Sequence, residues 1–411
     1  MTRALPPGAV GPSDGRNVDL EVGALAGEAA GQLVRVQRAP PTSIADALPE
    51  EEREGTYHGL PLLKAPVWRW EIPAYFFVGG LAGACGVLGA AARLAGGPPA
   101  RDLVRRCALV ATAGAGVSAV LLIRDLGRPE RFLNMLRVFR PTSPMNMGTW
   151  VLSGFGAASA LSLAPHLLPL PPALAAVGEG AGVAAGVFGL PLVGYTGVLL
   201  ANTAVPVWQE TRRALPVLFA FSGAASAGDL FELWRPRGTG AAMARRLGLV
   251  STAAELGAAL WLFREADRVP RVSRPLRRGR SGAVFGAGLA LAALSMVAGL
   301  AAPRRALARA RRPGARDRLH AVAGALGLAG TLAIRFGILM AGRASAKDPR
   351  ATFEQQRAGH GAEELVERGR VPRPMPAPPG VEPTGIAAGQ GFRAGEAWQG
   401  DGAGAPGQRT T

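Results

Sequence analysis

The chain has 411 residues, of which 48% are hydrophobic, and a formal net charge of +17. Its two cysteines, Cys85 and Cys107, are too few to ligate an iron–sulfur cluster and lack CxxC spacing, so we interpret both as small buried apolar side chains. The four histidines lie in polar tails or at the ends of apolar segments and offer no facing pair for a bis-histidine haem.

The two ends of the chain are polar and differ in composition from the centre. Residues 1–66 and 344–411 are rich in Gly, Pro, Ala and charge and have no sustained apolar period, so we expect disordered tails. Residues 371–384 predict an extended, polyproline-like conformation. The first 30 residues show no signal-peptide pattern. We therefore divide the chain into an N-terminal tail (1–66), a central domain (67–343) and a C-terminal tail (344–411).

Eight apolar segments fill the central domain, each nearly free of charge and bounded by arginine. A helix that crosses about 30 Å of hydrocarbon needs roughly 20 apolar residues. In chain order the segments are 73–92, 107–123, 141–178, 180–209, 214–228, 247–263, 281–303 and 319–342. A single segment of this kind is also typical of a buried core helix in a soluble enzyme. Eight in succession favour a membrane protein with eight spans.

The excess of positive charge has a simple explanation in that setting. Arginines cluster between apolar segments, at 264–280 and 304–318, where they meet anionic lipid head groups. We therefore expect no nucleic acid as a partner. Lys and Arg are slightly more numerous on the side that carries both termini, so the positive-inside rule leans toward cytoplasmic termini.

Small residues recur along the spans. Gly79, Gly83 and Gly86 share one face of the first span, and Gly282 and Gly286 have GxxxG spacing in the seventh. Small side chains let helix backbones approach closely in lipid. In a chain with 57 glycines the pattern fits ordinary helix packing as well as specific dimer contacts.

Polar side chains gather on one membrane face. With eight spans, the start of span 1, the loop between spans 2 and 3 and the end of span 4 must share a side. Trp68, Trp70 and Trp208 lie there, and we interpret them as interfacial aromatics. In the loop, Asp125 and Arg128 stand beside a Gly-Arg-Pro turn together with Glu130 and Arg131. This crowding predicts an ion-pair network.

Five segments of the chain resemble the NrfD/PsrC family, which includes the membrane subunit of polysulfide reductase. They are WRWEIPAYFFVGGLAGA at 68–84, RDLGRPERFLNMLRVFRPTSPMNMGTW at 124–150, YTGVLLANTAVPVW at 195–208, PVLFAFSGAASAG at 216–228, and GRASAKDPRATFEQQR at 342–357. The order DLGRP and then SPM is the most specific part of this match. The long N-terminal tail departs from compact members of the family.

The resemblance implies a fold and a role. We expect an all-α integral membrane protein with eight transmembrane helices in two four-helix bundles, multi-pass in the cell membrane, with disordered polar tails. Family members hold no prosthetic group and bind an exchangeable quinone, menaquinone or ubiquinone, near one face. They exchange electrons with a ferredoxin-like iron–sulfur subunit, which usually connects to a molybdopterin catalytic subunit.

Candidate quinone-binding residues follow from the polar face. Tyr195 lies about ten residues from the end of span 4, so about 15 Å below the surface, and a phenol at that depth needs a partner. Asn202 lies two turns nearer the surface, and Glu71 opens span 1 as a possible proton carrier. Asp125 and Arg128 complete the set. Structural alternatives remain: an interhelical tyrosine, a carboxylate favoured by a helix N-terminus, and a loop salt bridge.

A second candidate set is ionisable and lies inside the spans. Asp229 and Glu232 lie near the far end of span 5, Glu255 lies at mid-depth in span 6, and Arg335 lies in span 8. Charges in the bilayer interior are paired, protonated or functional. Simple rise arithmetic separates Glu255 from Arg335 by about 10 Å in depth. An anchor between helices and a proton path are both open interpretations.

Three functional hypotheses remain: a quinone-reactive subunit of an oxidoreductase complex, which we favour, a structural membrane anchor for a soluble dehydrogenase, and an ion transporter. A transporter should show broken helices in an inverted repeat. Pro191 and Pro206 interrupt span 4, but span 8 has no equivalent.

Overall fold

The structure, a computed structural model, describes residues 62–126, 130, 132–301 and 313–355, with side chains from residue 318 in the last range. Near the N-terminus it also gives the backbone of two short antiparallel strands, β1 (Val18–Asp19) and β2 (Ala24–Leu25). Apart from these strands, residues 1–61 and 356–411 of the predicted tails lie outside the described residues, as do Arg128 and Arg131.

Eight long helices account for most of the described chain. They are α3 (Glu71–Ala95), α4 (Arg101–Asp125), α6 (Pro144–Leu167), α7 (Pro172–Ala201), α9 (Ala214–Leu233), α10 (Gly240–Ala266), α12 (Gly279–Ala301) and α13 (Pro313–Ala346). Within the described residues, eight helices are long and apolar enough to cross a membrane. The sequence-based prediction of eight spans in an all-α protein is confirmed.

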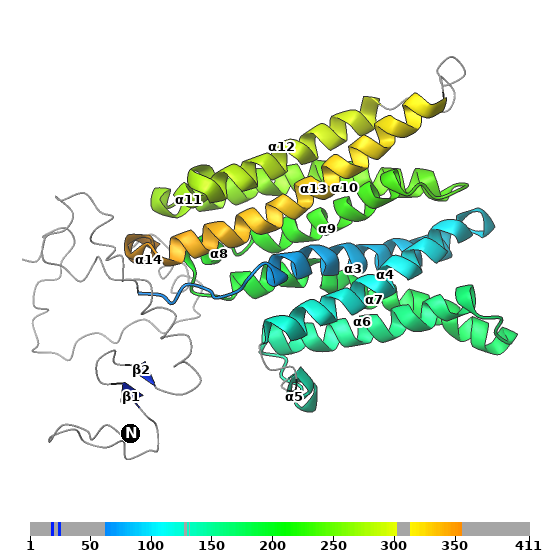
Figure 1. The fold of residues 1–411 in the computed structure, drawn as a ribbon, viewed down its shortest axis with the longest axis horizontal. Helices are drawn as coiled ribbons and strands as arrows, with labels where there is room; N and C mark the ends of the chain where they lie inside the picture. The colour runs from blue at the N-terminus through cyan, green and yellow to red at the C-terminus, as the bar shows by residue number, and fades with distance from the viewer. Residues whose placement is uncertain are drawn as a thin grey trace, which may run out of the picture. The chain divides into compact units, whose positions relative to one another are not determined.

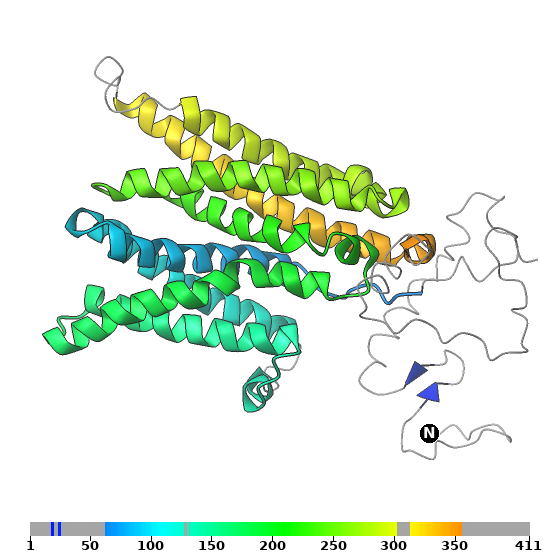
Figure 2. The same cartoon turned by 180° about the vertical axis from the view of Figure 1, so that it is seen from behind.

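The long helices form two groups of four. In the first bundle α3 packs against α4 and α7, and α6 packs against α7 and α4. In the second bundle α12 packs against α13, and α9 packs against α10 and α13. Helices α3 and α7 join the bundles through contacts with α9 and α13 (Figures 1 and 2). The predicted pair of four-helix bundles is therefore confirmed.

Short helices occupy the connections. They are η3 (Pro98–Ala100), α5 (Phe132–Arg137), α8 (Pro206–Glu210), α11 (Pro270–Arg277) and α14 (Pro349–Gln355). Proline opens several helices because its missing N–H would have no helical partner at the first position. At α6, Ser143 adds a side-chain cap by accepting a hydrogen bond from the Asn146 backbone N–H at 3.4 Å. Helix α13 runs to Ala346, and α14 follows within the segment from residue 344 that we placed in the C-terminal tail. Asp348 caps α14 by accepting a hydrogen bond from the Arg350 backbone N–H at 3.1 Å.

The two bundles share two opposite ends. We call the end where α3 begins the Glu71 face, and the end where α3 finishes the Arg93 face. Because the eight helices alternate in direction, α4, α7, α10 and α13 finish at the Glu71 face. The connections that hold α5, α8 and α11, together with α14, therefore lie at this face, whereas η3 lies at the Arg93 face (Figure 1).

Glycine sets the helix spacing at two crossings. A Cβ at Gly189 of α7 would lie 2.5 Å from the Gly83 carbonyl oxygen of α3, and the Gly228 and Gly248 backbones of α9 and α10 meet in the same way. Gly286, by contrast, has open space around it, because a Cβ added there would meet nothing within 4 Å. The small residues of the first span thus serve packing between helices of this chain.

Candidate functional site

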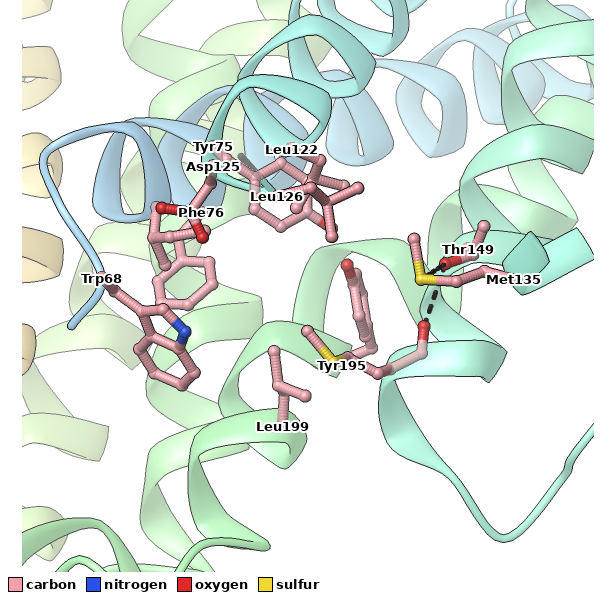
Figure 3. A pocket seen from close by; sticks show the side chains of 12 residues that line it. Trp68, Tyr75, Phe76, Leu122, Asp125, Leu126, Met135, Thr149, Tyr195 and Leu199 are labelled. Carbon is pink, nitrogen blue, oxygen red and sulfur yellow. Dashed lines mark hydrogen bonds between the residues drawn. The ribbon is translucent and has the colours of Figure 1, made fainter. Parts of the chain in front are cut away.

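An apolar pocket lies in the first bundle near the Glu71 face (Figure 3). Its cavity volume is about 50 Å³, and it is enclosed by α3, α4, α6 and α7 with one residue from α5. The lining consists of Trp68, Ile72, Tyr75, Phe76, Leu122, Asp125, Leu126, Met135, Met145, Thr149, Tyr195 and Leu199. A cavity of this size holds a few water molecules, so a ligand as large as a substituted six-membered ring fits only if side chains move.

Two phenols meet in the pocket. The rings of Tyr75 and Tyr195 are in T-shaped contact with centroids 6.5 Å apart. Tyr75 is 1% exposed, and its hydroxyl has no hydrogen-bond partner among the described residues. The Tyr195 ring packs against Gly148 of α6, where any side chain would overlap it. A buried phenol without a protein partner is available to a ligand or to water.

Two carboxylates lie at the outer end of the pocket. Asp125, the last residue of α4, lines it, and Glu71, the first residue of α3, is among the charges that act on Asp125. Glu71 is only 5% exposed, and its Oε2 has no hydrogen-bond partner among the described residues. Arg124 Nε lies 3.8 Å from Glu71 Oε1, but the Arg124 side chain is 69% exposed, so this contact is weak. Both carboxylates therefore lie at helix ends, between the pocket and the Glu71 face.

Flexible side chains close the pocket on the α6 side. The Thr149 hydroxyl has two acceptors in reach, the Met145 carbonyl oxygen at 3.1 Å and the Met135 sulfur at 3.7 Å (Figure 3). Methionine is unbranched and adapts to irregular space. These three residues and Tyr75 were not among the candidates predicted from the sequence. The SPMNMGTW segment and the YFF run that contain Thr149, Met145 and Tyr75 were the available signal.

The lip of the pocket is fixed by the second bundle. Trp68 stacks on Trp208 with ring centroids 5.7 Å apart, and Trp208 Nε1 donates to the Ile338 carbonyl oxygen of α13 at 3.0 Å. Arg343 donates to the backbone carbonyls of Pro66 and Trp68. Trp208 is fully buried, so the interpretation as an interfacial aromatic is wrong for it. Its side chain instead fills space beside Gly342.

Some predicted site residues do not reach the pocket. Asn202 is exposed and donates to the Val198 carbonyl oxygen at 2.9 Å, as part of the end of α7, and it does not line the cavity. Arg128 lies outside the described residues, so the ion-pair network that we predicted for the loop stays a prediction. Tyr195 and Asp125 are the two candidates that line the pocket, with Glu71 adjacent.

The second candidate set centres on Glu255 and Arg335. Both are buried, and Arg335 is the cation that acts on Glu255. Arg335 Nη2 donates to the Phe219 carbonyl oxygen at 2.9 Å, and the guanidinium lies 3.9 Å from the centre of the Phe219 ring. Helix α10 ends at Ala266 and α13 at Ala346, eleven residues beyond Glu255 and Arg335 respectively. Both therefore lie about 16 Å from their helix ends, at similar depth, rather than about 10 Å apart.

The other two members lie closer to the Arg93 face. The Glu232 carboxylate lies 2.6 Å from His320 Nδ1 and 4.0 Å from Arg245. Asp229 lies 3.1 Å from the Ser295 hydroxyl, which also lies 2.8 Å from the Ala323 carbonyl oxygen. Each carboxylate thus joins α9 to a neighbouring helix. Among the described residues no group of three or more His, Cys, Asp or Glu side chains is arranged to hold a metal ion.

Comparison with protein families gives one match. Residues 61–346 match the family described as "Polysulphide reductase, NrfD". A comparison with curated proteins found no match. The matched range covers all eight spans and the pocket, and it amounts to well over half of the chain. The chain therefore belongs to the NrfD family of multi-pass membrane proteins, which are membrane subunits of molybdopterin and iron–sulfur oxidoreductases.

Proposed function

We propose that this protein is the quinone-interacting subunit of such a complex and exchanges electrons between membrane quinone and a docked iron–sulfur subunit. The observation that carries the proposal is the pocket at the Glu71 face, where an unpartnered Tyr75 hydroxyl, Tyr195 and Asp125 meet inside an apolar lining. A quinone needs hydrogen bonds at its carbonyl oxygens and apolar surface around its ring. The pocket offers both.

The chemistry divides between the phenols and the carboxylates. Reduction of a quinone takes up two electrons and two protons, and oxidation of the quinol releases them. The hydroxyls of Tyr75 and Tyr195 are suited to donate hydrogen bonds to a quinone oxygen. Asp125 and Glu71 are suited to carry protons between that oxygen and water, because Asp125 lines the pocket and Glu71 lies beside it with a free oxygen.

Entry of the ring requires the pocket to widen. The cavity volume of about 50 Å³ falls short of a substituted quinone ring. Met145 is 52% exposed and Met135 is partly exposed, so both thioether side chains are free to swing toward lipid without loss of deep packing. We infer that these two methionines move when quinone binds, while the tyrosines keep their positions.

The partners belong on the same face. Electrons reach quinone efficiently over a short path only, so a ferredoxin-like iron–sulfur subunit must dock near the pocket. The Glu71 face carries α5, α8, α11 and α14, which give a structured surface outside the spans. A molybdopterin catalytic subunit then connects through the iron–sulfur subunit and needs no contact with the membrane domain.

The test compares carboxylate and phenol variants in the purified complex. Glu71→Gln should lower quinone-linked turnover by roughly tenfold or more, because proton transfer by a positioned acid or base contributes at least that much. Tyr195→Phe should weaken apparent quinone affinity by roughly three- to tenfold through one lost hydrogen bond. Glu179→Gln, a carboxylate change at the Arg93 face, is the matched control and should leave turnover unchanged.

Other outcomes point to the other functions. If the variants assemble normally and quinone-linked turnover stays at the level of the control, the pocket is not a quinone site and the protein is a membrane anchor. A photoreactive quinone analogue that labels residues 97–105 at the Arg93 face would also contradict the proposal. For transport, helix α7 runs unbroken through Pro191 to Ala201, so the proline that we took as an interruption does not create a broken helix.

A further inference from the structure

A second cavity, of about 730 Å³, lies in the first bundle at the Arg93 face. It is formed by the end of α3, by η3, by the starts of α4 and α7 and by the end of α6. Its charged and titratable lining side chains are Arg93, Arg101, Asp102, Arg105, His166 and Glu179. The cavity is separate from the quinone pocket, which lies at the opposite end of the same helices.

Both acidic side chains of this cavity already have partners. Glu179 accepts a hydrogen bond from Arg93 Nε at 2.9 Å, and Arg93 also donates to the Ser162 hydroxyl at 2.7 Å. Asp102 lies 3.1 Å from Arg106 Nε and accepts from the Arg237 backbone N–H at 2.7 Å. Neither carboxylate is therefore free to neutralise the other arginines of the cavity, Arg101 and Arg105.

Three donor groups of the cavity remain without an acceptor. Among the described residues, neither the Arg101 nor the Arg105 side chain has a hydrogen bond or an ion pair. They stand four residues apart on one face of α4, where like charges repel each other. Nε2 of His166 is buried and also lacks a partner within the described part of the chain. The charges that act on this imidazole include Arg93 and Arg105. The cavity thus has an excess of donors and positive charge.

The depth and surroundings of the cavity indicate the source of the anion. Arg93, Arg101 and His166 lie within a few residues of their helix ends, at the level of lipid head groups. Large apolar side chains near the cavity are exposed: Leu94 is 75% and Leu167 is 63% exposed at the helix ends, and Leu161, deeper on α6, is 54% exposed. A ligand held here by its anionic group has apolar surface directly below it for acyl chains.

We propose that this cavity binds the phosphate group of an anionic phospholipid. Arg101 and Arg105 hold the phosphate oxygens, His166 Nε2 supplies a further hydrogen bond, and the acyl chains run along the outer surface of α3 and α6. Basic pockets between transmembrane helices are a recurring form of site for anionic lipid head groups. The proposal does not depend on the quinone function, because it uses the other end of the bundle.

The experiment measures lipid retention on the purified full chain, or its complex, by native mass spectrometry. Phosphatidylglycerol should be retained over phosphatidylcholine, and Arg101→Gln with Arg105→Gln should reduce this retention by roughly tenfold. Arg246→Gln with Arg318→Gln is the matched control: these two exposed arginines lie at the same face on the second bundle and carry the same total charge. The control variant should retain phosphatidylglycerol like the unchanged protein.

A third variant reverses the sign. Glu179→Gln frees Arg93 from its carboxylate and removes one negative charge from the cavity, so it should increase retention of phosphatidylglycerol. Equal retention of both lipids, or equal losses in the test and control variants, would overturn the proposal. The phosphate source is tested with glycerol phosphate and inorganic phosphate in thermal stability assays. Stabilisation by these soluble anions that depends on Arg101 and Arg105, without selectivity among lipids, would replace the lipid by a soluble phosphate and also overturn it.

Discussion

The two four-helix bundles differ in where their polar groups lie along the helices. In the first bundle the titratable groups lie near the two helix ends, with Glu71 and Asp125 at one face and Arg93 and His166 at the other. In the second bundle Glu255 and Arg335 lie about 16 Å from the helix ends, fully enclosed by protein. The first arrangement leaves cavities that a ligand can enter, whereas the second leaves charges that only protein groups can satisfy.

This difference separates binding from assembly. A charge inside a membrane protein is tolerated when an opposite charge or backbone carbonyl accompanies it. Arg335 donates a hydrogen bond to the Phe219 carbonyl, lies over the Phe219 ring and attracts the Glu255 carboxylate, so it links α13 to α9 and α10. Both carboxylate oxygens of Glu255 and two nitrogens of Arg335 lack a hydrogen-bond partner among the described residues, so charge attraction is what pairs these two side chains. In the first bundle the Tyr75 hydroxyl and Glu71 Oε2 also lack a partner within the described part of the chain, but they lie at or beside the pocket of the Glu71 face. We therefore expect substitutions in the second bundle to reduce stability and those in the first to reduce quinone turnover.

The largest effect should follow from Arg335→Met. Removal of the cation leaves Glu255 buried without its counter-charge and should cost about 3–5 kcal/mol of stability. Adding Glu255→Gln should recover part of the loss, because the uncompensated carboxylate is then gone. Unfolding in graded detergent mixtures measures the stability of the unchanged protein, the Arg335→Met variant and the double variant. Arg264→Met, an exposed arginine change on α10, is the control and should stay within about 0.5 kcal/mol.

The same variants separate the anchor from the proton path. If Glu255→Gln alone abolishes proton movement in vesicles while stability stays unchanged, Glu255 carries protons and the assignment of the second bundle to assembly fails. Quinone affinity should remain near normal in either case, because Glu255 does not line the pocket at the Glu71 face.

A smaller but more specific effect should follow from Gly148→Ala in the first bundle. The added methyl group would overlap the Tyr195 ring and push it from its position. Overpacking of this kind costs about 1–3 kcal/mol, and the displaced phenol should lower quinone-linked turnover by more than the loss of folded protein explains. Turnover per folded complex is the measurement. Gly116→Ala, at an exposed site with no neighbour within 4 Å, should leave turnover unchanged.

These two predictions also show what the sequence was able to reveal. The eight spans follow from charge-free segments of sufficient length, so their number and order were predictable. Tyr195 and Asp125 were found as candidates because a polar group at a span end, or below it, is unusual. Gly148, Thr149 and the methionines were not, because their relevance depends on which faces of α6 and α7 meet. Helix rotation of this kind has no local signal in segments rich in small residues.

The predicted difference in depth between Glu255 and Arg335 was wrong for a related reason. The apolar segments end where charges begin, whereas α10 and α13 continue to Ala266 and Ala346. Helix ends, rather than the limits of the apolar segments, set the position of a residue along the bundle. Trp208 likewise looked interfacial from its place in the sequence, but the connection after α7 folds it inward against α13.

A third prediction tests the contact by which the second bundle supports the pocket of the first. Arg343→Gln removes the hydrogen bonds to the Pro66 and Trp68 carbonyls and frees the segment before α3. Stability should fall by about 1–3 kcal/mol, and apparent quinone affinity should fall by roughly threefold, because Trp68 lines the pocket. Titration of turnover against quinone concentration measures the second effect. Unchanged affinity would show that the two bundles act independently, and the exposed Lys347→Gln serves as the control.

The smallest effect should come from an ion pair of the second bundle that lies outside the spans. Asp267 accepts two hydrogen bonds from Arg277, at 3.1 and 2.5 Å, and both side chains are about half exposed. The Arg277 guanidinium holds the pKa of the Asp267 carboxyl below its ordinary value. The pair therefore contributes stability above the unfolded pKa, near pH 4, and loses it as the pH falls through the lower folded pKa.

Asp267→Asn should cost less than about 1 kcal/mol at neutral pH, because water and salt screen an exposed pair. The difference should vanish in strong acid and shrink at about 1 M salt. A loss as large as that of Arg335→Met would show that charge alone, rather than burial, sets the stability of the second bundle.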